Sequence, residues 1–216
     1  MTGQPGPPAA QRPSGIVLAG GRATRFGADK LAAPVAGRPL LHRPIEALAD
    51  VCGEVVIVVG REGRVPPLPA GLRVPLRVAR DETAGGGPLV GLIAGLAEAT
   101  GATAIVAGGD MPGLVPGLLV ELERRVAAGG ATAAALVDGD RIRPLPCAMR
   151  RAPALAAARA LLADGRTRLR DVLDALGAAG LTEAEWRALD PAGRSLIDID
   201  RPGDLARLGE QEPGYR

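Results

Sequence analysis

The stretch GIVLAGGRATRFGADK, residues 15–30, decides how this chain folds. Its first part, residues 15–20, is apolar on both faces, which is typical of a central strand in a parallel sheet covered on both sides. The part that follows is rich in glycine and in basic residues. Glycine loses more backbone entropy on folding than any other residue, so glycines gather where the backbone must turn sharply or approach a ligand closely. We therefore predict a buried strand followed by a loop that holds a ligand.

The rest of the chain alternates short Val- and Ile-rich runs with longer Ala- and Leu-rich segments, the pattern of an α/β protein with a mostly parallel sheet. The predicted strands cover residues 15–20, 54–60, 72–80, 103–110, 131–140, 143–151 and 194–200. The predicted helices cover residues 38–51, 87–100, 116–130, 151–163, 167–176 and 201–210, with a short helix around Trp186. We expect one three-layer, doubly wound, Rossmann-like domain over residues 15–209. A disordered tail at 1–14 precedes it and a short tail at 210–216 follows it.

The composition excludes several functional classes. The 26 Lys and Arg residues nearly offset 24 Asp and Glu residues, so the clustered basic surface of nucleic-acid binders is not expected. Aromatic residues make up 1% of the chain, too few for platforms that stack bases. No apolar run reaches the length of a membrane span, and the first residues lack the apolar middle of a signal peptide. Cys52 and Cys147 match no metal-ligand spacing and indicate a reducing compartment. We expect a cytoplasmic protein that binds neither nucleic acid nor membrane.

Glycines and cations follow the first strand, at the edge where open parallel sheets bind their ligands. Gly20 and Gly21 can turn their backbone N–H groups toward phosphate oxygens. Arg22, Arg25 and Lys30 add positive charge that would stabilise a transferring phosphate. The spacing matches neither a P-loop nor a dinucleotide fingerprint, and a solvated glycine turn is the alternative.

Two more strand ends carry carboxylates. Asp110 ends the strand of GGDMP, residues 108–112, and either holds Mg²⁺ or caps the next helix. Asp198 and Asp200 in IDID are two residues apart, so a strand would place both on one face. Two neighbouring carboxylates repel each other unless a cation bridges them or water surrounds them.

A second glycine-rich loop lies in DETAGGGPLVGL, residues 81–92, and runs into a predicted helix. Its backbone could lie flat against a base or ribose, with Asp81 accepting a hydrogen bond. A flexible turn explains the same composition equally well. The order of these segments, rather than any one of them, favours a nucleotide site.

The stretch LAGGRATRFGADK, residues 18–30, resembles the signature of the molybdenum cofactor guanylyltransferases. GGGPLVGL, GGDMPGL and IDIDRPGDL follow in the order found in that family, so the resemblance spans residues 15–209. It implies a nucleotidyltransferase fold of the nucleotide-diphospho-sugar transferase type. It also implies Mg²⁺-dependent transfer of GMP from GTP to the phosphate of molybdenum-bound molybdopterin, which gives the guanine dinucleotide cofactor and pyrophosphate.

The resemblance further implies roles for individual residues. It implies catalytic roles for Lys30, Arg25 and Asp110, and Mg²⁺ ligation by Asp110 together with Asp198 or Asp200. The nucleotide-binding residues that it implies are Leu18, Ala19, Gly20, Gly21, Lys30, Asp81, Gly87, Pro88, Leu89 and Asp110. Cofactor-delivery proteins of the same pathway are possible partners, and we expect a monomer or weak homo-oligomer.

Three alternatives stay open. Asp at both IDID positions, 198 and 200, also occurs among cytidylyltransferase relatives, whereas LAGG and GPL favour guanine. A guanylyltransferase that uses another phosphorylated acceptor, such as phospholactate, is the second alternative. A nucleotide-binding regulatory domain without turnover is the third.

Overall fold

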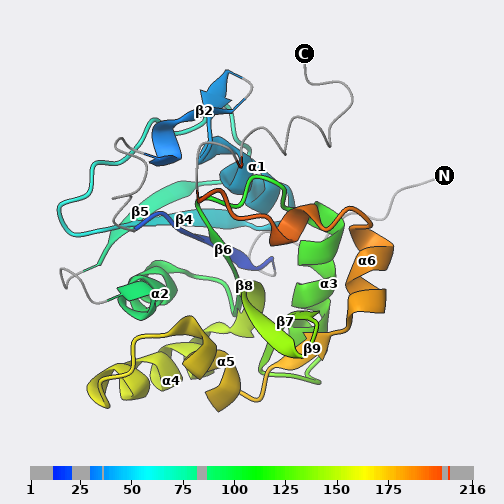
Figure 1. Cartoon of the computed structure of the whole chain (residues 1–216). Coiled ribbons are helices and arrows are strands. Elements are labelled where there is room, and N and C mark those ends of the chain that lie inside the picture. The colour runs from blue at the N-terminus through cyan, green and yellow to red at the C-terminus, as the bar shows by residue number, and fades with distance from the viewer. Residues whose placement is uncertain (1–11, 21–29, 36, 82–86, 201–203, 205–216) are drawn as a thin grey trace.

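The fold is built on a seven-stranded sheet in a computed structural model that describes residues 12–20, 30–35, 37–81, 87–200 and 204 (Figure 1). The strand order is β5-β4-β1-β6-β8-β7-β9. The strands are β1 (Ser14–Leu18), β4 (Glu54–Val59), β5 (Leu76–Arg80), β6 (Thr103–Gly108), β7 (Ala133–Asp138), β8 (Arg141–Arg150) and β9 (Ala179–Leu181). β5, β4, β1 and β6 run parallel, and β8 is antiparallel to both β6 and β7. The predicted mostly parallel α/β sheet is confirmed.

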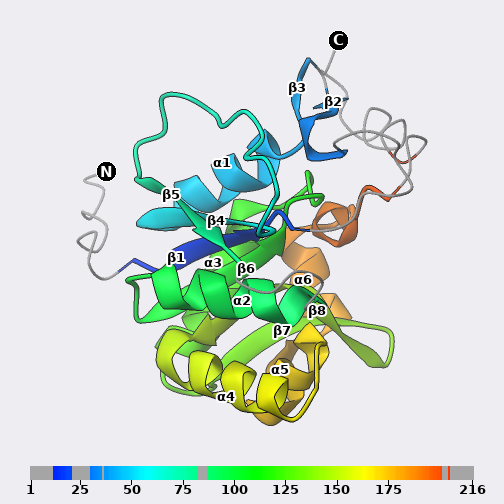
Figure 2. The same ribbon diagram turned by 90° about the vertical axis from the view of Figure 1, so that its left-hand side faces the viewer.

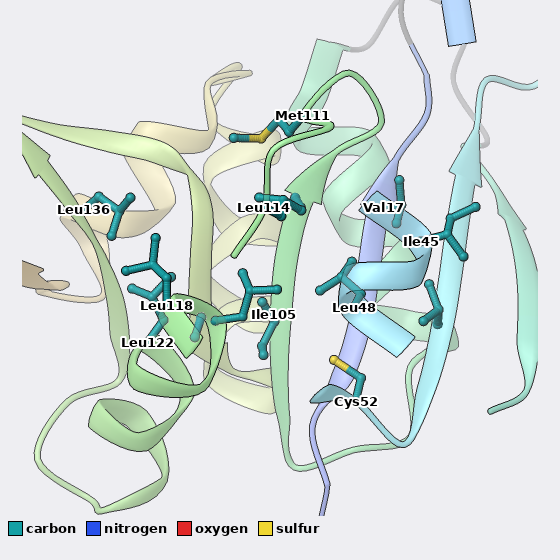
Figure 3. Close-up of a cluster of buried hydrophobic side chains, with 14 of the residues drawn as sticks. Val17, Ile45, Leu48, Cys52, Ile105, Met111, Leu114, Leu118, Leu122 and Leu136 are labelled. Carbon is teal, nitrogen blue, oxygen red and sulfur yellow. The ribbon is translucent and has the colours of Figure 1, made fainter. Parts of the chain in front are cut away.

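Helices cover both faces of the sheet, because its central strands are apolar on both. The helices are α1 (His42–Val51), α2 (Gly87–Glu98), α3 (Pro116–Ala127), α4 (Arg151–Ala163), α5 (Leu169–Ala175) and α6 (Glu183–Leu189). Residues of α1, α3 and α6 pack with Val17 and Ile105 on one face, as the close-up in Figure 3 shows for α1 and α3. Residues of α2, α4 and α5 pack with Ile16 and Val106 on the other face (Figure 2). This is the expected three-layer arrangement.

The path of the chain through the sheet creates a place for a ligand. From β1 the chain passes to β4 and then to β5 on one side. It returns through α2 to β6, which pairs with β1 on the other side. β4 and β5 thus lie on one side of the β1–β6 pair and β8, β7 and β9 on the other, and ligands of doubly wound sheets bind at such a switch point.

The start of the domain and the first predicted helix differ in detail from the expectation. β1 begins at Ser14, and the Arg12 guanidinium donates hydrogen bonds to the carbonyls of Asp50 and Val51 at the end of α1. The remainder of the expected tail, residues 1–11, lies outside the described residues. Residues 38–41 are not helical, because Arg38–Pro39 (β3) pairs with Pro34–Val35 (β2). The helix predicted at 38–51 therefore starts at His42.

The strand predicted at 194–200 is wrong. The Asp190 carboxylate accepts hydrogen bonds from the backbone N–H groups of Arg194 and Ser195, and a 3-10 turn, η3 (Arg194–Leu196), forms instead. The IDID segment that follows pairs with no strand among the described residues, and the N–H of Ile199 donates instead to the carbonyl of Asp110. The strand β9 was not predicted. The helix expected at 201–210 falls, apart from residue 204, outside the described residues.

Two further findings concern the cysteines and the helices. Cys52 and Cys147 are both free and buried, and burial raises the pKa of the Cys147 thiol to about 12. Neither thiol is therefore available as a nucleophile. None of the helices in the described part of the chain combines the length and the apolar character that crossing a bilayer requires.

Candidate functional site

The site is organised around an ion pair at the switch point. Lys30 Nζ lies 2.8 Å from Asp110 Oδ2 and 3.2 Å from Asp200 Oδ1. Lys30 opens a short 3-10 turn, η2 (Lys30–Ala32), and its side chain is 13% exposed. Asp110 is 32% exposed and Asp200 is 70% exposed, so the carboxylates face an open edge while the ammonium is largely covered.

A tight turn after β6 positions Asp110. The N–H of Gly109 donates to the carbonyl of Leu18, which joins the ends of β1 and β6, and the N–H of Met111 donates to Gly108. A Cβ atom at Gly108 would lie 2.5 Å from Asp110 Oδ1. The missing side chain at this position therefore leaves the space in which the Asp110 carboxylate lies.

The segment 197–200 reaches the site through one backbone contact. The N–H of Ile199 donates to the carbonyl of Asp110 at 2.9 Å, and the Ile199 side chain is fully buried beside Val35 and Leu40. Ile199 thus anchors the segment, and the carboxylates on either side of it reach different partners. Asp200 contacts Lys30, whereas Asp198 Oδ2 lies 3.2 Å from Nη2 of Arg143.

The charges of the site perturb two of its pKa values. Burial alone would lower the pKa of Lys30, but the hydrogen bonds and charges of Asp110 and then Asp200 outweigh it, and the pKa is raised. Lys30 is therefore a permanent cation at neutral pH. The pKa of Asp198 is raised by desolvation and by the charge of Asp110, against the opposing effect of Arg143. The carboxylates are close enough to repel one another, and a cation placed among them would be bound favourably.

The donor set suits a hard divalent cation, although the side chains do not form a closed cage. Among the described residues, no three His, Cys, Asp or Glu side chains are already grouped as a metal site. Lys30 links Asp110 and Asp200, and Asp198 turns toward Arg143. Mg²⁺ characteristically takes one or two carboxylates and completes its shell with water and substrate phosphates, so the open carboxylate edge fits it.

The opposite side of the switch point is formed by backbone. The N–H of Ala19 donates to Val58, and a Cβ at Gly20 would lie 3.4 Å from the backbone nitrogen of Gly60. The Arg80 guanidinium donates from Nη1 to the carbonyls of three residues in the turn after β4, namely Gly60, Arg61 and Gly63. The N–H of Asp81 donates to Val59, directly beside this turn. Nothing in the sequence pattern indicated that Arg80 would hold this turn.

The predicted residues of the second glycine loop lie at the start of α2. Gly87 has a φ of +75° and lies against Thr167, a conformation that favours glycine. Pro88 is exposed, whereas the Leu89 side chain is fully buried, so only the backbone of Leu89 can face a ligand. Leu18 ends β1 partly buried. Gly21, Arg22 and Arg25 lie outside the described residues, so their predicted roles stay predictions.

Comparison with known proteins identifies relatives across nearly the whole chain. The model of the MobA-like NTP transferase domain matches residues 15–180. A protein of Chloroflexus aggregans named a probable molybdenum cofactor guanylyltransferase is 36% identical over 196 residues, covering 89% of this chain and 91% of the relative. A protein of Pelotomaculum thermopropionicum with the same name is 30% identical, covering 90% of each. The crystal structure of molybdopterin-guanine dinucleotide biosynthesis protein A from Archaeoglobus fulgidus matches with a TM-score of 0.73 and 22% identity, covering 91% of this chain and 97% of that one.

Proposed function

The chain belongs to the family of MobA-like NTP transferase domains, and from that premise we propose that it transfers GMP from GTP to the phosphate of molybdenum-bound molybdopterin. The products are the guanine dinucleotide cofactor and pyrophosphate. The observation that carries the proposal is the contact of Lys30 with Asp110 and Asp200 at the switch point of the sheet. The guanylyltransferase names of the relatives support guanine and this acceptor.

The proposed reaction is an in-line displacement. An oxygen of the acceptor phosphate attacks the α-phosphorus of GTP, and the bond to the oxygen that bridges the α- and β-phosphates breaks. The attacking oxygen is already anionic, so positioning and charge stabilisation are sufficient and no strong general base is required. Lys30 stabilises the negative charge on the phosphates, together with Arg25 and the N–H groups of Gly20 and Gly21.

Nucleotidyltransferases of this kind typically use a divalent metal, and we propose Mg²⁺. Asp110 would hold it, with Asp198 or Asp200 as the second ligand. When bound, Mg²⁺ neutralises charge on the triphosphate. The remaining predicted residues, Leu18, Ala19, Asp81 and the backbone of Gly87, Pro88 and Leu89, would line the nucleoside and its phosphates.

We further propose that the reaction takes place in the cytoplasm, which is consistent with two free buried cysteines. The protein would act as a monomer or weak homo-oligomer that exchanges its acceptor and product with other proteins of the same pathway.

Ligand-dependent thermal stability tests the nucleotide, since a ligand that binds only the folded state raises the melting temperature. GTP, CTP, ATP and UTP are compared with and without Mg²⁺. Of the four nucleotides, only GTP should raise Tm, and the rise should depend on Mg²⁺. A rise in Tm with CTP instead would favour a cytidylyltransferase. Release of pyrophosphate from GTP with molybdopterin then tests turnover. A protein that binds GTP but releases no pyrophosphate with this acceptor would reject the acceptor, and one that releases none with phospholactate either would be a regulatory domain rather than an enzyme.

A further inference from the structure

Arg143 lies at the same edge of the sheet as Asp110, on the side away from β4 and β5. β8 pairs with β6 only from Arg150 to Cys147, opposite Thr103 to Val106. Arg143 lies beyond the last of these pairs, in the direction of the carboxyl end of β6. The mononucleotide half of a doubly wound sheet is β1 with the strands that follow it, here β4 and β5. If the nucleotide occupies the side of β1, β4 and β5, then Arg143 lies on the other side, where the acceptor would bind.

The guanidinium of Arg143 connects this edge to the segment that carries the two late carboxylates. Its Nη2 donates to the carbonyl of Leu196 and to Oδ2 of Asp198, each at 3.2 Å. Both hydrogen bonds that the guanidinium makes among the described residues come from this one nitrogen. Nε is buried and has no hydrogen-bond partner there.

An unpartnered buried N–H is uncommon in folded proteins, and each case calls for an explanation. Arginine carries five N–H donors in a planar fork that matches the geometry of a phosphate. Among the described residues Nη2 alone of the three nitrogens donates hydrogen bonds, so the N–H groups of Nη1 have no partner there. The Arg143 side chain is 32% exposed, so the group is held in place and is still in contact with solvent.

The charge balance of the site also calls for a cation here. A phosphorylated acceptor must approach Asp110, Asp198 and Asp200, which repel it. Lys30 already contacts two of these carboxylates. Arg143 contacts the third through a single hydrogen bond, and a phosphate dianion offers it more acceptor oxygens than one carboxylate does.

We infer that Arg143 binds the phosphate of the acceptor, with phosphate oxygens replacing Asp198 on its guanidinium fork. The inference rests on the proposed function for the identity of the acceptor, but not for the chemical class of the group, which is a phosphate monoester or free phosphate. It makes Arg143 a binding residue of the acceptor side, distinct from the residues that contact GTP.

Binding measurements without turnover test this role. The nucleotide site is filled with Mg²⁺ and a GTP analogue that has a methylene group between the α- and β-phosphates, so that no transfer takes place. Molybdopterin and, separately, inorganic phosphate are then titrated by calorimetry into the wild type, Arg143→Gln and Arg143→Lys. Arg141→Gln is the matched control, because Arg141 lies two residues away on the same strand and is exposed.

Arg143→Gln should lower the affinity for both probes roughly 10- to 100-fold, which is the loss expected when hydrogen bonds to a charged group are removed. Arg143→Lys should recover part of the affinity, because it restores the charge without the fork. Arg141→Gln should bind as the wild type does, and the GTP analogue should bind all variants equally.

A positioning role through Asp198 makes a different prediction. If Arg143 acts only by holding Asp198, the change Arg143→Gln has no further effect in an Asp198→Asn background. If Arg143 binds the phosphate, it weakens binding in that background too. Equal affinities in the wild type and Arg143→Gln, or a wild type that binds neither probe, would overturn the inference. A wild type that binds phosphate but not molybdopterin would instead reject the proposed acceptor. The comparison of phosphate affinity between the wild type and Arg143→Gln would then still decide the role of Arg143.

Discussion

Lys30 and Asp110 are 80 residues apart in the sequence, yet their side chains are in contact at 2.8 Å where the ends of β1 and β6 meet. Partly exposed ion pairs contribute little to stability, about 1 kcal/mol or less. The pair is therefore better explained by the chemistry of the site than by the stability of the sheet.

Removing either member should separate activity from stability. Lys30→Met and Asp110→Asn should each lower kcat for GMP transfer about 100-fold or more, since each removes charge stabilisation of the transferring phosphate. The free energy of unfolding in urea should change by about 1 kcal/mol or less. Arg187→Met, which breaks the exposed pair with Glu183 on α6, is the control and should leave kcat unchanged. Full activity of Asp110→Asn would reject the proposed metal ligand.

Arg80 should act on the nucleotide and not on the acceptor. Arg80→Met removes the hydrogen bonds that hold the turn at Gly60 against Gly20. We expect KM for GTP to rise about 3- to 10-fold, because exposed hydrogen bonds that hold the turn are lost, with KM for the acceptor unchanged. Steady-state kinetics with each substrate varied in turn measure both. Arg73→Met, an exposed arginine in the preceding loop, should change neither, and an equal effect of the two variants would refute the role of Arg80.

Two glycines of α2 should respond in opposite ways to alanine. A Cβ at Gly95 would lie 2.6 Å from Ile16 Cγ2 and 3.0 Å from Val58 Cγ2, whereas a Cβ at Gly91 would make ordinary contacts at 3.6 Å or more. Gly95→Ala should therefore lower the free energy of unfolding by about 1–3 kcal/mol through overpacking. Gly91→Ala should be neutral or raise it by up to about 1 kcal/mol through helix propensity. Urea unfolding of both variants measures the difference, and similar values would contradict the packing of α2 on the sheet.

Glu54 should make stability depend on acid pH. Its carboxylate accepts hydrogen bonds from the N–H and hydroxyl of Thr100 and from the Ser14 hydroxyl, and it lies 3.3 Å from Arg77. Burial alone would raise its pKa, but these hydrogen bonds and then Arg77 outweigh burial, and the pKa is lowered. Because the folded-state pKa is below the unfolded one, the stabilisation is present above the unfolded pKa of about 4.3 and is lost as the pH falls through the folded value.

The variant Glu54→Gln checks this assignment. It should lower the free energy of unfolding at pH 7 by about 1–3 kcal/mol, because it removes a buried charged acceptor. The difference from the wild type should shrink as the pH falls below about 4. Glu98→Gln, which breaks a more exposed contact with the same Arg77, should change stability by less than about 0.5 kcal/mol at either pH. A difference for Glu54→Gln that persists unchanged into acid would show that its charge is not responsible.

The sequence was sufficient to predict the parallel centre of the sheet and the position of Asp110 after one of its strands, although not the strand β9. Three apolar runs are too short for helices and have the composition of buried parallel strands, namely residues 15–20, 54–60 and 103–110. Once those strands are parallel, their carboxyl ends lie together, which places Asp110 beside the end of β1. Lys30 opens η2, well after β1 ends at Leu18, so its contact with Asp110 does not follow from the strand order and was not predicted.

The late segment was harder to predict, because its conformation depends on how neighbouring polar groups are used. Ile and Asp alternate at 197–200 as in a strand, but the Asp190 carboxylate caps the turn at Arg194 and Ser195. Arg143 gave no signal because a lone arginine in a partly exposed strand is ordinary. The role inferred for it rests on its contact with Asp198, 55 residues away, and on a buried Nε that has no hydrogen-bond partner among the residues that the structure describes.

The hydrogen bond from Ile199 to Asp110 also joins two parts of the chain that are far apart in the sequence. Such a contact closes a long loop, which costs conformational entropy. A chain truncated before Asp198 would lack this contact and both late carboxylates, while it would retain every strand that the structure describes.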